Sequence, residues 1–433
     1  MPRSEPKSSQ KTASSSLKSK LNQPSGAPSN SRTTTGKRIA RGLWRWTGRG
    51  LIASPLLILL LWIAVHNVPG LGPALADGLR AVIGVEAVTS LENKAYAAQD
   101  RFNQWWYGNE PPKAYWEVPA TASASASTAT SAEVDAGPPP LAPFRPADVG
   151  PVHTSWSAPG DGQWVPIVDA QHPAAPTVMF KTLLHSDRNR SWAEVFVVAV
   201  DLRQVDLHAV AGWQEPKSFE VAGSKYKRTA KIPVSDHARL LGAFNGGFKT
   251  EHGYYGMKID GVTLVKPRPT ACTVAALKDG SLKIATWKSI EGIEDRMLWY
   301  RQAPGCMYEG GKRHPGLSDP NARSWGATLD GETVIRRSAI GLDDSAQVLY
   351  VAITKDTTAR ALADGMHHAG ATTVAQLDVN FSYPKFLLYE PSDAGELKAV
   401  PLAKGFEHKD NEYIGALSMR DFFYLTRKPD ADG

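Results

Sequence analysis

Three short runs in the C-terminal half of the chain carry side chains that could bind a phosphate and a sugar together. They are residues 245–249 (NGGFK), 337–341 (RSAIG) and 377–382 (LDVNFS). The first supplies an amide that donates and accepts hydrogen bonds, beside glycines that allow close approach to the backbone. The second supplies a guanidinium, which binds phosphate through two parallel hydrogen bonds, and the third supplies a carboxylate.

Each run also has an ordinary structural interpretation. An Asn-Gly-Gly sequence is usually a simple turn, and an arginine at a strand end often pairs with a surface acid. Arg336 should point to the face of its strand opposite to Arg337. Glu251 and His252, close to the first run, are a further candidate pair for acid–base chemistry.

The order and surroundings of the three runs resemble the phosphodiester glycosidase family, whose motifs read N-x-G-F-F, R-T-A-I-G and N-L-D-G-G-G-S. The resemblance spans roughly residues 192–415. It implies that Asp378 acts as acid or base, or stabilises charge on the sugar, while Asn245 and Arg337 hold the phosphate. The implied catalytic residues are Asp378, Arg337, Asn245 and Ser382, and Gly246 and Gly247 are expected to bind substrate. Lys249 and Asn380 stand where the family has an aromatic residue and a glycine; both are also candidates for substrate binding, although Lys249 could instead face solvent.

The third run departs from the family motif, because Val379, Asn380 and Phe381 occupy its glycine positions. Side chains there block a ligand from the backbone, although Asn380 tolerates positive φ and its amide could replace a lost donor. The sequence therefore leaves two functions open. One is hydrolysis of sugar-phosphodiester linkages in envelope or exopolysaccharide glycans; the other is a catalytically inactive module that binds a glycan or a protein. A scaffold that recruits envelope machinery is a third, more general alternative.

The N-terminal region predicts a membrane anchor. The first 50 residues contain eleven Lys and Arg against one acid, so the Ser-rich arm over 1–48 is expected to be disordered. Residues 51–68 are apolar and uncharged, which predicts a transmembrane helix over 49–68 with the N-terminus in the cytoplasm. A cleaved secretory signal fits this long basic region poorly. We expect a single-pass protein of the cell inner membrane whose C-terminal domain is periplasmic or extracytoplasmic.

Composition divides the exported part into three segments. Residues 69–117 predict a helical, aromatic-rich stalk that lies on the membrane, packs on a partner or docks on its own domain. Residues 118–150 are rich in Ala, Ser and Pro and predict a linker. Residues 151–428 are long enough for a full hydrophobic core and form the expected phosphodiester glycosidase-like domain.

Within this domain, short apolar runs alternate with tight turns, often Asp-Gly, which predicts β-hairpins. The expected strand pairs are 192–200 with 205–210, 257–259 with 262–265, 272–277 with 282–286, and 326–329 with 333–337. A helix is expected over 357–370, with Asp356 as N-cap, followed by a strand over 373–377 that ends at Asp378. The predicted fold class is α+β, with hairpin-rich sheets and a few packed helices.

The chain has two cysteines, Cys272 and Cys306. In an oxidising compartment they could form a disulfide that closes a loop of about 34 residues and contributes about 3 kcal/mol; the alternative is two buried thiols. No cofactor is predicted, since zincin, P-loop and serine-hydrolase motifs are absent, and a divalent cation is left open. The expected partners are a glycan or glycosyl phosphodiester and, through the N-terminal helix, the membrane. Nucleic acid is not expected.

Overall fold

The computed structural model describes residues 84–118, 142–318, 333–380 and 382–429, together with single positions between 60 and 83. The basic arm, nearly all of the expected anchor over 49–68, and residues 119–141 of the expected linker lie outside this part. Within it, no helix combines the length and apolar character that a membrane crossing requires.

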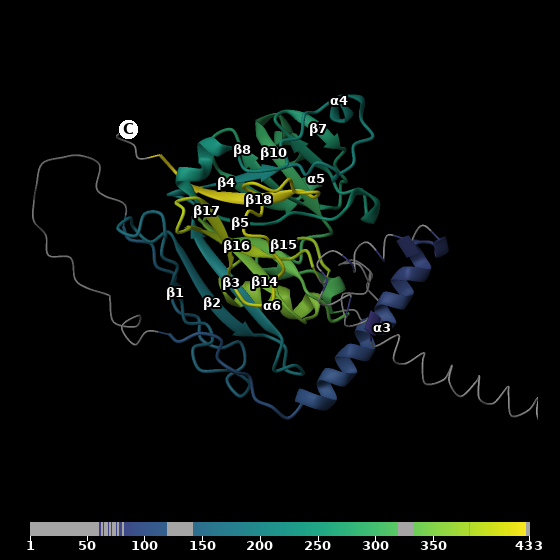
Figure 1. The fold of residues 1–433 in the computed structure, drawn as a ribbon, viewed down its shortest axis with the longest axis vertical. Helices are drawn as coiled ribbons and strands as arrows, with labels where there is room; N and C mark the ends of the chain where they lie inside the picture. The colour runs from purple at the N-terminus through teal and green to yellow at the C-terminus, as the bar shows by residue number, and fades with distance from the viewer. Residues whose placement is uncertain are drawn as a thin grey trace, which may run out of the picture. The chain divides into compact units, whose positions relative to one another are not determined.

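Three antiparallel sheets form the domain (Figure 1). The largest has eight strands, in the order β1 (Val165–Pro166), β2 (Met179–His185), β3 (Glu194–Asp201), β14 (Val348–Thr354), β13 (Ser338–Leu342), β15 (Thr373–Gln376), β11 (Tyr308–Glu309) and β12 (Lys312–Arg313). A second has β7 (Val262–Val265), β6 (Met257–Ile259), β10 (Met297–Ala303), β8 (Cys272–Leu277) and β9 (Leu282–Thr286). The third has β17 (Leu397–Pro401), β16 (Phe386–Pro391), β5 (Leu240–Asn245), β18 (Phe422–Arg427) and β4 (Val205–Val210).

Helices of the domain are few and short apart from α6 (Ala359–His368), which covers one face of the eight-stranded sheet. The other short helical segments described are α4 (Val221–Ser224), α5 (Trp287–Ile290), and the 3₁₀ turns η2 (Val234–Arg239), η3 (Thr250–His252), η4 (Glu291–Arg296) and η5 (Pro315–Leu317). The fold is therefore mixed α and β with mainly antiparallel sheets, as the sequence predicts.

The eight-stranded sheet is buried on both faces. Along β3, Val195 and Val197 pack in one apolar cluster with Leu362 and Met366 of α6. Alternate residues of the same strand, such as Phe196, pack in a second cluster on the opposite face. Because successive side chains of a strand point to opposite faces, burial on both sides explains why β3 is a continuous apolar run.

The second cluster is the core in which the three sheets meet. It contains Phe196 of β3, Phe244 of β5, Trp299 of β10 and Phe423 of β18. The ring centroids of Phe244 and Phe423 lie 5.3 Å apart, and those of Trp299 and Phe423 lie 5.7 Å apart. One shared core thus fixes the ends of β5, β13 and β15, which carry the residues expected to do chemistry.

Two predicted hairpins are confirmed and one is wrong. β6 pairs with β7 and β8 pairs with β9, each across its expected turn. By contrast, β3 and β4 belong to different sheets, although they are adjacent in sequence. The Asp201 carboxylate accepts hydrogen bonds from the side chains of Arg203 and Gln204. The resulting turn carries the chain from one sheet to the next instead of closing a hairpin.

The helix after β14 begins later than the sequence suggests. Its N-cap is Thr358, whose Oγ1 accepts a hydrogen bond of 3.1 Å from the Ala361 N–H, and not Asp356. The expected strand over 333–337 is a single bridge between Ile335 and Thr357, and its expected partner over 326–329 lies outside the described residues. Thr358 is the N-cap because its hydroxyl reaches an otherwise unsatisfied N–H group of the first helical turn.

The predicted stalk contains a long helix, α3 (Val85–Tyr107), preceded by Gly84 at φ 86°. Asp100 of α3 forms an ion pair of 2.7 Å with Arg190 of the domain. The Tyr107 ring lies 5.9 Å from that of Trp192. Of the three alternatives, docking on its own domain is the arrangement seen for this helix.

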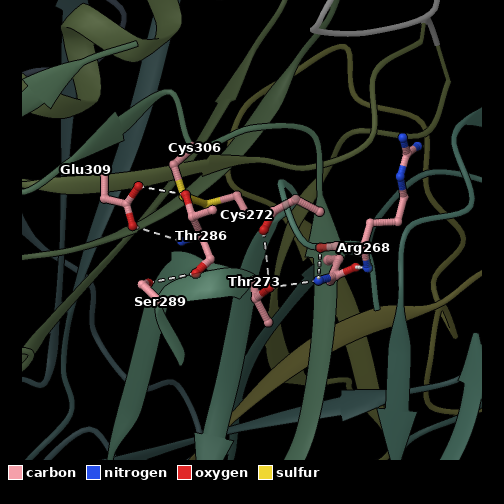
Figure 2. Close-up of a disulfide and its surroundings, with 9 residues drawn as sticks. Arg268, Cys272, Thr273, Thr286, Ser289, Cys306 and Glu309 are labelled. Atoms are coloured by element: carbon pink, nitrogen blue, oxygen red, sulfur yellow. Dashed lines mark hydrogen bonds between the residues drawn. A yellow bond between two sulfur atoms is a disulfide. The ribbon is translucent and has the colours of Figure 1, made fainter. Parts of the chain in front are cut away.

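Cys272 and Cys306 are joined by a disulfide (Figure 2). It ties the start of β8 to the segment that follows β10, across a sequence separation of 34 residues. Beside it, Thr286 of β9 donates to a carboxylate oxygen of Glu309 at 2.7 Å, which links the second sheet to β11 of the first. The disulfide therefore reinforces a junction between two sheets.

Replacing both cysteines by serine should lower the free energy of unfolding by about 3–4 kcal/mol, because an unfolded chain without the cross-link gains loop entropy. Urea denaturation followed by tryptophan fluorescence measures this loss. Adding a reducing agent to the native protein is the matched control and should give the same loss. A double variant as stable as the native protein would show that the cross-link contributes nothing to stability.

Candidate functional site

The three sequence runs converge where the eight-stranded sheet meets the third sheet. The Asn245 side-chain amide, at the end of β5, donates to Ser338 Oγ of β13 at 2.8 Å. Ser338 Oγ donates to the Asp378 carbonyl at 2.9 Å, and the Asp378 N–H donates to the Gly246 carbonyl at 3.1 Å. Residues that are far apart in sequence thus share one hydrogen-bonded junction.

The Asp378 carboxyl group lies at the centre of this junction and is almost fully buried, with 2% of the residue exposed. One oxygen accepts a hydrogen bond from the Val379 N–H at 2.9 Å, and the other forms an ion pair with Arg420. Burial raises the pKa of Asp378 to about 6, although Arg420 and the Val379 N–H act in the opposite direction. The carboxyl group can therefore change its charge near neutral pH.

Arg420 is the cation that faces Asp378. Its guanidinium donates a hydrogen bond to the Gly247 carbonyl at 3.3 Å and lies 4.2 Å from the centre of the Tyr383 ring. Its Nε is buried without a hydrogen-bond partner among the described residues. The side chain keeps 11% exposure against 3% for Asp378, so a ligand from solvent would meet Arg420 first.

A second buried ion pair supports the first. Arg301 of β10 and Asp421 approach to 2.8 Å, and each is at most 2% exposed. Asp421 also accepts from the Gly247 N–H at 2.8 Å, and Arg301 donates to the Phe248 carbonyl at 2.6 Å. Two arginines and two aspartates therefore form a compact group of alternating charge, which we call the buried charge network: Arg301, Asp421, Arg420 and Asp378.

The glycines of the first run are required by this network. A Cβ atom on Gly246 would lie 2.2 Å from a carboxylate oxygen of Asp421, and one on Gly247 would lie 2.7 Å from the Arg301 guanidinium carbon. These contacts are shorter than any side chain tolerates. In the structure the two glycines make room for the side chains of Asp421 and Arg301. The sequence had suggested that they make room for a ligand.

Arg337, expected to bind phosphate, is fully buried. Its guanidinium donates to the main-chain carbonyls of Thr333 at 2.7 Å and Thr357 at 3.1 Å, and to Gln376 Oε1 at 3.3 Å. β13 pairs Ala339 with Gln376 in an antiparallel register. Extending this register by two residues on each strand places Arg337 opposite Asp378. Arg337 thus holds the segments around the site, while Arg420 makes the contact with Asp378.

The remaining expected residues are Asn380 and Ser382, which follow Asp378 in the same loop, and Lys249, which follows the glycine pair in sequence. Asn380 Oδ1 accepts from the Ser382 N–H at 2.9 Å and from the Tyr383 N–H, so this side chain closes a turn. Lys249 is partly buried just before η3, and Phe381 lies outside the described residues. Neither Val379 nor Asn380 has a positive φ. At these two positions the backbone therefore does not adopt the conformation that favours glycine.

The acid–base candidate next to the first run has a different role. Glu251 forms a 2.5 Å ion pair with Lys217, and this hydrogen bond lowers the pKa of Glu251. Both side chains are at least half exposed. Glu251 is therefore ionised near neutral pH and belongs to the surface rather than to the junction around Asp378.

Sequence reasoning did not identify Arg420, Asp421 or Arg301, and it considered Tyr383 only as an aromatic platform for a sugar ring or as a hydrophobic plug. The Tyr383 hydroxyl donates to the Asp421 carbonyl at 2.7 Å, and burial raises its pKa well above the usual range, so it stays a neutral donor. One indication of a role for Arg420 and Asp421 was present in the sequence: these two charged residues immediately precede the apolar strand β18. Among the described residues, no group of three or more His, Cys, Asp or Glu side chains could hold a metal ion.

No protein-family model and no curated protein matches this chain. Among solved structures, a hypothetical protein from Synechocystis aligns at 11% identity and a TM-score of 0.33, over 59% of this chain and 65% of that one. A provisionally assigned exported protein from Burkholderia pseudomallei aligns at 9% identity and a TM-score of 0.24, over 59% and 76% of the two chains. At these values neither likeness bears on the function of this chain.

Arg301→Met should destabilise the protein by about 3–5 kcal/mol, because it leaves the Asp421 carboxylate buried without its cation. Urea denaturation measures the loss. Arg296→Met is the matched control, since Arg296 pairs with Asp279 at 3.0 Å on the surface with both side chains more than half exposed. The control should lose less than about 1 kcal/mol. Equal losses in the two variants would show that the buried charge network has no special role in stability.

Proposed function

We propose that residues 151–428 form a phosphodiester glycosidase-like domain, and that the protein hydrolyses sugar-phosphodiester linkages in envelope or exopolysaccharide glycans. The observation that carries this proposal is the meeting of the three sequence runs at Asp378, a buried carboxyl group paired with an arginine. A carboxylate beside a guanidinium suits a substrate that has a sugar carbon next to a phosphate.

In this proposal the side chain of Arg420 binds the phosphate. Its Nε is free to donate among the described residues, and a phosphate oxygen could replace Asp378 as the partner of its outer nitrogen. Lys249, next to the glycine pair, would add positive charge near the same ligand. Asn245, Arg337 and Ser382 position the main chain around Asp378, and Asn380 shapes the loop that follows it.

The reaction consumes one water molecule. The bond between the sugar carbon and the bridging oxygen breaks, and the phosphate leaves as a monoester with the bridging oxygen and the bonding electron pair. Water adds its hydroxyl group to the sugar carbon, and its remaining proton passes to the phosphate monoester or to solvent. A phosphate monoester is a stable anion, so its departure depends little on protonation. The ionised Asp378 carboxylate would stabilise the positive charge that develops on the sugar in the transition state. The proposal requires no cofactor.

We place the protein in the cell inner membrane, with residues 49–68 as a single-pass anchor and the domain in the periplasm or outside the cell. The charge distribution of the N-terminal region supports this location, because basic residues precede the apolar segment. A disulfide in the domain fits an oxidising compartment.

A non-catalytic module that binds a glycan or a protein is the second candidate. It is favoured by the closed state of the site: Asp378 is 2% exposed, and the Val379 N–H donates to Asp378 instead of facing outward. In such a module the buried charge network would hold the fold together, and binding would use other surfaces.

Asp378→Asn and Arg420→Gln should each reduce hydrolysis at least about a hundredfold, because each removes a charge proposed to act in the transition state. The measurement is release of free sugar from a panel of sugar-1-phosphodiesters by the full-length protein in detergent. Asp410→Asn and Arg296→Gln are the matched controls, since both side chains are more than half exposed. If the native protein releases no sugar but binds a glycan, and this binding survives Asp378→Asn, the binding module is correct.

Hydrolysis should increase as the pH rises through about 6, the raised pKa of Asp378, because the ionised carboxylate is the proposed active form. The logarithm of kcat/KM against pH should show this limb in the native protein, and the Asp410→Asn control should reproduce it. A rate that falls over the same range would mean that Asp378 acts as a proton donor.

The same group affects stability without any substrate. Since folding raises the pKa of Asp378 above the usual carboxyl value of 3.8, the folded protein binds its proton more tightly between about pH 4 and 6. The contribution of Asp378 to stability is therefore greatest at low pH and decreases as the pH rises to 6. The difference in unfolding free energy between the native protein and Asp378→Asn, measured at several pH values, should follow this decrease.

A further inference from the structure

An open cleft of about 440 Å³ lies at the edge of the second sheet. The residues that line it all precede Asp378 in the sequence, and none belongs to the three runs. Its volume falls in the range of small-molecule sites. The lining combines aromatic, aliphatic and charged side chains: Phe219, Glu220, Tyr254, Leu264, Val265, Lys266, Pro267 and Arg268.

Two aromatic side chains of the cleft are unusually exposed. Phe219 is 68% exposed and Tyr254 is 53% exposed, with their ring centroids 6.1 Å apart. Tyr254 also has φ 54°, in the left-handed region that a residue with a bulky side chain rarely adopts. Exposed aromatic surface and local backbone strain both cost stability, and strained residues concentrate at sites of function.

Charged groups border the aromatic pair. Lys266 pairs with Glu220 at 3.2 Å, and its side chain is 74% exposed. The guanidinium of Arg268 lies 5.6 Å from the centre of the Tyr255 ring and donates to the Gly253 carbonyl. The cleft therefore has two cations and one acid beside two exposed rings.

The cleft is connected to the candidate site through β10. Arg301 of the buried charge network donates to the Tyr255 carbonyl at 3.0 Å. The next residue, Gln302, accepts through Oε1 from the N–H groups of Gly256 at 3.0 Å and Arg268 at 2.7 Å. Adjacent residues of one strand thus hold both the loop of Gly247 and the wall of the cleft.

We propose that this cleft binds an anionic glycan, with a sugar ring stacked on Tyr254 and Phe219 and an acidic group held by Lys266 and Arg268. The C–H face of a pyranose is apolar and packs well on an aromatic ring, while carboxylate or phosphate groups pair with lysine and arginine. The inference deepens the proposed function and rests on it for the class of ligand.

Calorimetry with the full-length protein in detergent tests the cleft through binding alone. The probes are an oligogalacturonate, glucose 1-phosphate and a neutral cello-oligosaccharide of equal length to the oligogalacturonate. The two acidic probes separate carboxylate from phosphate as the source of the charge. Oligogalacturonate contains no phosphodiester, so its binding does not depend on the hydrolytic step.

Tyr254→Ala should weaken binding of an acidic probe about tenfold or more, and Tyr254→Phe should retain it, because the ring makes the contact. Lys266→Gln should weaken acidic probes only, whereas Lys312→Gln, on the exposed strand β12, should change nothing. Tyr254→Gly should lose binding without lowering Tm, since glycine relieves the positive φ.

The outcomes separate the two proposals. Tyr254-dependent binding without sugar release from any phosphodiester supports the cleft and contradicts hydrolysis. Hydrolysis with no effect of Tyr254→Ala on binding overturns the cleft and leaves the proposed function intact. Absence of binding by the native protein to every probe, or equal binding of neutral and acidic probes, also overturns the inference.

Discussion

The arrangement of the site depends on the burial of four alternating charges, those of Arg301, Asp421, Arg420 and Asp378. Removing a charge from water costs several kcal/mol, and this cost is offset only when attraction and hydrogen bonds replace the lost hydration. Here the main chain provides part of the replacement, because Gly247 donates to Asp421 and accepts from Arg420. The network therefore dictates the course of the backbone around it, including the two positions that must be glycine.

If the proposed site binds a phosphate, the same network makes ligand binding and fold stability interdependent. Attraction between charges is stronger in a low-dielectric interior than in water, so Arg420 would bind a phosphate strongly once water is excluded. Such a phosphate would have to compete with Asp378 for the guanidinium. If it succeeds, the Asp378 carboxylate loses part of its partner's charge and is left to stabilise the positive charge that the breaking sugar bond creates. The ion pair seen in the structure would then be the resting state of a site that opens on binding.

Local sequence patterns predicted the turns and the helix, because these features depend on residues that are close together in the chain. Asp-Gly turns fixed two hairpins, and periodicity located α6 to within two residues at each end. The position of Asp378 at a strand end was predicted, because the apolar run over 373–377 stops at this residue. The division into three sheets could not be predicted, because the turn after Asp201 would serve a hairpin equally well. The buried charge network was missed for a related reason: Asp421 is 174 residues from Gly247 and 120 from Arg301, so no local pattern connects them.

The third run has Val379 and Asn380 at positions that are glycine in the motif it resembles. Glycines after the aspartate would let main-chain N–H groups point toward an anion. In this chain Val379 is buried, and its N–H donates to Asp378. Asn380 uses its side chain to close the following turn. The main-chain N–H groups of Val379, Ser382 and Tyr383 are thus committed within the protein. In the proposed site a phosphate would therefore rely on side chains, and Arg420 both reaches Asp378 and retains contact with solvent.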